Sequence, residues 1–178
     1  ALKDAAPWQA RQEGETYFVK LHNAVNAGTQ VQRLIWLGLK GDASSAAFLN
    51  QTYPNITEEA WQLAEVLSGI SMVQTATAEA FVPQMLNYES VDGVSFKKGC
   101  YPGQEVVARS QFRGTLKRRA FIVSCTAPML VGQDIFSSED AEQACGMVSS
   151  ASKFEPIEGQ AAKWWGIASL QLSATEHA

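Results

Sequence analysis

Residues 97–109 read KKGCYPGQEVVAR, a segment that joins a lone cysteine and a Pro-Gly turn to a helical pattern. Pro102 suits the first turn of a helix because it lacks the N–H group that would stay unpaired there. The sequence therefore predicts a short helix over residues 102–109, directly after Cys100 and Tyr101.

The chemistry of this segment allows two interpretations of Cys100. In the first, the positive end of the helix dipole and the ammonium group of Lys98 stabilise a reactive thiolate. Glu105 in the first turn would accept backbone N–H bonds or hold a lysine, and Gly103 would let the backbone approach a ligand in a pocket suited to anions. In the second, Cys100 is a small buried residue in a tight turn, since lone cysteines are commonly inert. The residue types leave both interpretations open.

Basic residues are concentrated around the same segment. Half of the 14 Lys and Arg residues fall within residues 97–119, where Glu105 is the single acid, so this window carries +6 in a chain of net charge −4. Such a stripe predicts a site for an anionic ligand, or else a solvated face whose acids come from elsewhere in the fold. Arg109 and Arg113 stand one helical turn apart and would bind a carboxylate or phosphate, or pair with acids of a neighbouring domain.

Length and composition limit the class of protein. The 178 residues are 46% hydrophobic and 18% charged, as in a soluble globular protein. We expect no membrane contact, because no apolar run approaches the roughly 20 residues of a spanning helix, and residues 1–18 lack the pattern of a signal peptide. Cys100, Cys125 and Cys145 show no CxxC spacing, so we expect no metal site, no disulfide framework and a cytoplasmic setting.

The pattern of the first 96 residues is typical of an α+β layer. Residues 15–21 predict a strand, and residues 31–39 predict a second strand buried on both faces. A short helix is expected around residues 44–49. Thr57 would cap a longer helix that Gly69 ends. Residues 70–96 lose this periodicity and predict an ordered but irregular segment.

The last third of the chain changes to short strands separated by turns. They are predicted over residues 119–125, 132–136, 144–151 and 164–172. Strands of this length and spacing favour a small antiparallel barrel or sandwich. We therefore divide the chain into a partial α+β domain of the ferredoxin-like type (1–80), a motif segment (81–114) and a C-terminal β-barrel (115–178).

The motif segment also carries a resemblance. KKGCYPGQEVVAR resembles the signature of the YgfZ family, K-x-G-C-[YF]-x-G-Q-E. The upstream VPQMLNYESVDGVSF and the downstream ARSQFRGTLKRRAF are similar to the segments that flank this signature in the family. The resemblance is sharp over residues 81–121 and diffuse elsewhere. Relatives carry a further N-terminal region, so the chain resembles the C-terminal portion of a larger protein.

The resemblance implies a fold and a function. The family is similar to the aminomethyltransferase (T-protein) of the glycine cleavage system, which is built around a tetrahydrofolate pocket. It supports, in a folate-dependent way, the assembly or repair of iron–sulfur clusters, including those of an enzyme that methylthiolates tRNA. The motif cysteine, here Cys100, is the functional residue, with Lys98 beside it. The predicted contacts to tetrahydrofolate or a one-carbon derivative of it are Tyr101, Gly103, Gln104, Glu105 and Arg109.

The expected partners follow from this resemblance. They are folate and iron–sulfur enzymes, with a weak tRNA contact, and the chain is expected to be a monomer. The alternatives are a true folate-dependent one-carbon transferase and a protein that binds RNA directly through the basic window 97–119.

Overall fold

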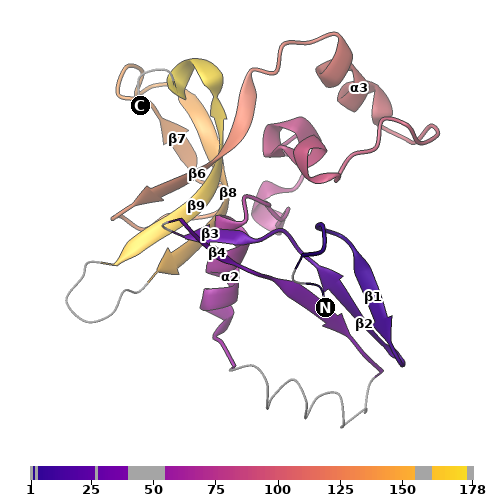
Figure 1. The fold of residues 1–178 in the computed structure, drawn as a ribbon. Helices are drawn as coiled ribbons and strands as arrows, with labels where there is room; N and C mark the ends of the chain where they lie inside the picture. The colour runs from indigo at the N-terminus through magenta and orange to yellow at the C-terminus, as the bar shows by residue number, and fades with distance from the viewer. Residues whose placement is uncertain (1, 3, 27, 40–54, 155–161, 176–178) are drawn as a thin grey trace.

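The computed structural model describes residues 2, 4–26, 28–39, 55–154 and 162–175. Within these ranges the chain forms antiparallel sheets and two α-helices, which confirms the predicted α+β class (Figure 1). The strands are β1 (Ala10–Glu13), β2 (Thr16–Lys20), β3 (Ala24–Asn26), β4 (Thr29–Val31), β5 (Leu34–Leu37), β6 (Arg118–Cys125), β7 (Asp134–Phe136), β8 (Ala144–Phe154) and β9 (Lys163–Gln171). The α-helices are α2 (Glu58–Leu67) and α3 (Gln104–Phe112). The 3-10 helices are η1 (Thr75–Thr77), η2 (Pro83–Leu86), η3 (Tyr88–Val91) and η4 (Leu172–Thr175).

The four short strands predicted in the last third of the chain form one antiparallel sheet in the order β6-β9-β8-β7. Its centre is buried, since Val148 on β8 and Ala168 on β9 are register partners and both are almost fully covered. The sheet is open within the described residues: β6 and β7 form its edges and do not pair with each other. The predicted closed barrel is therefore not formed there, because β7 has three residues and closure needs pairing along both edges.

Helix α2 packs across this sheet, against β8 and β9 (Figure 1). Its start is the predicted one, because the hydroxyl of Thr57 accepts a hydrogen bond from the N–H of Ala60 at 3.2 Å. Gly69 follows the helix with φ +74°, the left-handed conformation that favours glycine at this position. Val66 and Leu67 bury the apolar side of the helix.

The N-terminal strands form two small sheets, β1-β2-β5 and β3-β4. The strand predicted over residues 15–21 is confirmed as β2, whereas the single buried strand predicted over residues 31–39 is wrong. That stretch contributes the end of β4 and the exposed edge strand β5, separated by Arg33. Arg33 is buried, ion-paired with Glu65 of α2 and stacked on Trp61 at 4.8 Å. Burial lowers the pKa of this guanidinium. The helix predicted around residues 44–49 lies outside the described residues.

The segment between α2 and the motif is ordered but irregular, as predicted. It contains the three 3-10 helices η1, η2 and η3, and Asn87 joins η2 to η3 with φ 57°. Among the described residues, no helix has the length and apolar character that crossing a membrane requires. The likeness to the T-protein fold and the three-part division of the chain stay predictions.

Candidate functional site

Helix α3 is held in place by one buried amide. The side chain of Gln84 in η2 is fully buried, and its Nε2 donates a hydrogen bond to the carbonyl of Val107 at 2.7 Å. Val107 is itself the buried residue of α3. The helix thus rests on η2 at Val107, while Gln104, Ala108 and Ser110 are half-buried and its other residues are exposed.

A second amide attaches the same irregular segment to the C-terminal sheet. Asn87 donates from Nδ2 to the carbonyl of Ala120 at 2.9 Å and accepts from the N–H of Ala120 at 3.2 Å. Beside it, Arg119 forms an ion pair with Glu89 and donates to the carbonyl of Gln84 at 3.3 Å. Arg119 therefore stabilises the fold, and its charge is paired with Glu89, an acid outside the basic window 97–119.

Sequence reasoning missed these anchoring roles. The signal was present, because Gln84 and Asn87 interrupt the apolar run VPQMLN with side chains that need buried partners. Their partners lie 23 and 33 residues further along the chain, where no local pattern indicates them.

Cys100 lies on the exposed turn before α3. The helix begins at Gln104, two residues later than predicted, with Gly103 at φ +80° as its N-terminal cap. The side chain of Gln104 accepts a hydrogen bond from the N–H of Tyr101 at 3.3 Å and so closes the turn. The interpretation of Cys100 as a buried residue is wrong, and its thiol is open to a partner.

Lys98 contacts the ring of Tyr101 rather than the thiol. Its Nζ lies 4.5 Å from the centroid of that ring, a cation–π arrangement worth about 0.5–1 kcal/mol at an exposed site. Gly99 and Gly103 have open space where a Cβ would stand, so nothing in the described chain crowds the backbone on either side of Cys100.

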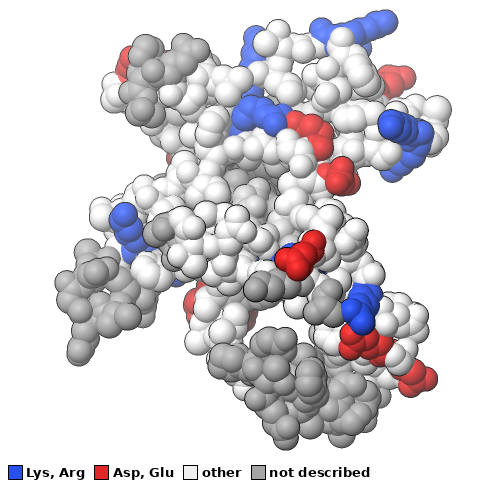
Figure 2. Space-filling view, viewed as in Figure 1, with Lys and Arg blue, Asp and Glu red and all other residues white. Residues whose placement is uncertain are grey.

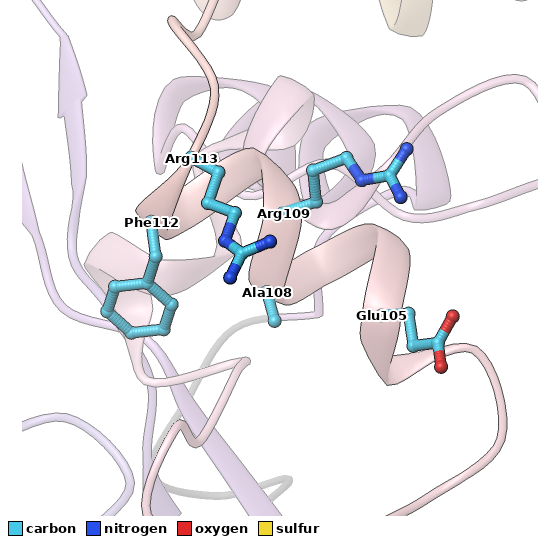
Figure 3. A pocket seen from close by; sticks show the side chains of 5 residues that line it. All are labelled: Glu105, Ala108, Arg109, Phe112 and Arg113. Carbon is cyan, nitrogen blue, oxygen red and sulfur yellow. The ribbon is translucent and has the colours of Figure 1, made fainter.

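The outer face of α3 borders a surface cavity of about 300 Å³ (Figure 3). Its lining comes from one side of the helix and consists of Glu105, Ala108, Arg109, Phe112 and Arg113. The prediction that Arg109 and Arg113 share a face is confirmed. Both are exposed, and neither forms an ion pair with any described residue. Figure 3 shows the Arg113 side chain lying back over Ala108, while Arg109 extends toward the side of Glu105.

The predicted folate contacts are divided between two places. Glu105 and Arg109 line the cavity, whereas Tyr101, Gly103 and Gln104 build the turn that precedes the helix. The exposed ring of Phe112, which sequence reasoning did not single out, belongs to the cavity as well. The sequence could have indicated this role, because Phe112 is an aromatic residue between two arginines on a helix with few other apolar residues.

Comparison with known proteins gives two informative relatives, and no family model matches the chain. Over 86 residues, 48% of this chain and 25% of the relative, it is 44% identical to the tRNA-modifying protein YgfZ of Photobacterium profundum. About half of the chain is therefore similar to YgfZ proteins. The YgfZ protein of Vibrio atlanticus is 37% identical over 99 residues, 56% of this chain and 29% of that relative. The resemblance drawn from KKGCYPGQEVVAR is thereby confirmed over about half of the chain, which spans between a quarter and a third of each YgfZ relative.

Proposed function

We propose that this chain acts in tRNA modification as a YgfZ-type, folate-linked accessory to iron–sulfur enzymes, with Cys100 as its reactive thiol. The observation that carries the proposal is the exposure of Cys100 on a turn within the YgfZ signature. The names of both relatives, tRNA-modifying protein YgfZ, support the process. A cytoplasmic setting would keep such an exposed thiol reduced.

The local structure supports a thiol that meets a macromolecular partner. Gly99 and Gly103 leave the backbone beside Cys100 uncovered, so a partner protein can reach the sulfur without moving a side chain of the turn. Lys98, whose Nζ lies over the ring of Tyr101, and the start of α3 add positive charge to this turn. Cys125 and Cys145 are not equivalent, because one donates to the carbonyl of Ala127 and the other is buried.

The residues fit folate only in part. The two guanidinium groups of Arg109 and Arg113 suit the carboxylates of a glutamyl tail. Tyr101, Gly103 and Gln104 do not line the same cavity, so the described residues give no enclosure for the ring system there. The folate contact that we propose is therefore Arg109, with Arg113 beside it. The alternative of a one-carbon transferase stays a prediction.

The test is complementation of cells that lack their own YgfZ protein, with tRNA methylthiolation measured by mass spectrometry of digested tRNA. We expect the full-length protein that contains this sequence to restore the modification, its Cys100→Ala variant to lose it, and the matched control Cys125→Ala to keep it. Full restoration by Cys100→Ala would remove the role assigned to this thiol. A full-length wild-type protein that is folded but gives no restoration would contradict the proposed function.

A further inference from the structure

We propose that the outer face of α3 is an RNA-binding surface, on which Phe112 stacks an unpaired base while Arg109 and Arg113 bind the flanking phosphates. The choice of RNA rests on the proposed role in tRNA modification. The surface itself rests on charge, exposure and geometry.

The first observation is a set of basic residues that form few ion pairs within the described chain. Of the seven in residues 97–119, Arg119 forms an ion pair, and no other does so with any described residue. Figure 2 shows several basic side chains over the upper part of the molecule, where α3 and its flanking segments lie in Figure 1, with acidic side chains among them. Because the remainder of the chain carries −10, a polyanion is attracted here and repelled elsewhere.

The second observation is an aromatic platform among these charges. Phe112 is 71% exposed although it lies on a helix, and Phe96 beside it is 41% exposed. Their rings meet edge to face, with centroids 5.6 Å apart and planes at 72°. Phe112 stays largely exposed in this arrangement, so much of its ring is open to a ligand. Val107 already supplies the packing of α3, so the fold does not need Phe112.

The third observation is the shape of the surface between these groups. Ala108, a small residue, lines the cavity together with Arg109 and Arg113, and this cavity has about 300 Å³, at the lower end of the range for ligand sites. Arginine flanking an exposed aromatic ring is the combination that binds unstacked nucleotides, since the ring stacks the base and the guanidinium binds the phosphate. An acidic peptide would use the charges but would not need the ring.

The experiment measures binding by fluorescence anisotropy, with a labelled anticodon stem-loop RNA and a blunt RNA duplex of equal phosphate number as probes. We expect the stem-loop to bind more tightly. Phe112→Ala should weaken its binding about 5-fold or more, and Phe112→Tyr should retain it, because stacking requires the ring and not its exact edge. Arg109→Gln and Arg113→Gln should each lower the slope of log affinity against log salt by about 0.7, whereas Phe112→Ala leaves the slope unchanged.

Two controls make each outcome decisive. Arg11→Gln removes an exposed arginine that is ion-paired with Glu13 on β1, and it should change neither affinity nor slope. Cys100→Ala should keep full RNA binding, so that failure of the thiol role and failure of this surface are separate results. The proposal is overturned if the duplex or a polyglutamate peptide binds as tightly as the stem-loop. It is equally overturned if Phe112→Ala, with a wild-type Tm, binds as the wild type does.

Discussion

The two α-helices of this protein are attached in opposite ways. Helix α2 covers β8 and β9 with a broad apolar contact, and buried hydroxyls such as those of Ser71 and Ser150, 3.0 Å apart, join its surroundings to the sheet. Helix α3 buries Val107 and is anchored by the amide of Gln84. The first helix is part of the core, while the second presents charged and aromatic side chains outward. Stability and the candidate function are thus located in different parts of the chain.

The largest expected effect comes from a substitution in the core, in the sheet on which α2 packs. Ile167 on β9 is 1% exposed, and Ile167→Ala should lower the free energy of unfolding by about 2–5 kcal/mol through lost burial and a residual cavity. Urea denaturation followed by tryptophan fluorescence measures it.

Ile122, the register partner of Ile167 on β6, is the matched control. Because it is 44% exposed, Ile122→Ala should cost less than about 1 kcal/mol. Equal losses for the two variants would show that the centre of the sheet is not the core.

The second expected effect is a local loss of stability in α3, without a change in the core. Gln84→Ala removes the donor to Val107 and leaves a polar gap beneath α3, at a cost of about 1–3 kcal/mol. Hydrogen exchange of the amides of α3 should accelerate about 5-fold or more, while those of β8 stay protected. The control Gln111→Ala changes an exposed glutamine of α3 and should leave both rates unchanged. Equal acceleration in α3 and β8 would mean that the two regions open as one unit.

Local patterns in the sequence were sufficient for elements whose signals lie within a few residues. Thr57 and Gly69 marked the ends of α2, and the turn residues between short segments placed the four C-terminal strands. Arg33 shows where prediction from local patterns fails. A charged residue inside an apolar run ends one strand and begins another because its partner, Glu65, lies 32 residues away. Barrel closure failed for a related reason, since it depends on the pairing of distant edges.

The candidate site likewise has features that local sequence predicts and features that depend on distant contacts. The shared face of Arg109 and Arg113 follows from helical spacing, so the sequence predicted it. The exposure of Cys100 does not follow from residue types, because it depends on how Gln84 and Gln104 hold α3 and the turn. There the family resemblance, rather than local chemistry, favoured the interpretation in which Cys100 is exposed.

The smallest expected effect concerns the charge of Glu59 in the first turn of α2. Hydrogen bonds from its own backbone N–H and from Thr57 hold the pKa of the Glu59 carboxyl below its ordinary value. A carboxylate with a lowered folded-state pKa stabilises the protein above its unfolded pKa, and this contribution is lost as the pH falls through the folded value. Glu59→Gln should therefore unfold at a lower Tm than the wild type at neutral pH, and the two curves should converge in acid.

Thermal unfolding from neutral pH down to about pH 3, below the ordinary glutamate pKa, checks this prediction. Glu142→Gln, far along the chain in an exposed turn, is the control that should show no pH-dependent difference. The carbonyl of Glu59 accepts a hydrogen bond from the hydroxyl of Ser152 on β8 at 3.4 Å, so the start of α2 is joined to the sheet. The stability lost in Glu59→Gln should consequently appear in the unfolding of α2 and the sheet together. The hydrogen exchange of the amides of α3 should not change. A Tm difference that stays constant with pH would assign the effect to the shape of the side chain instead of its charge.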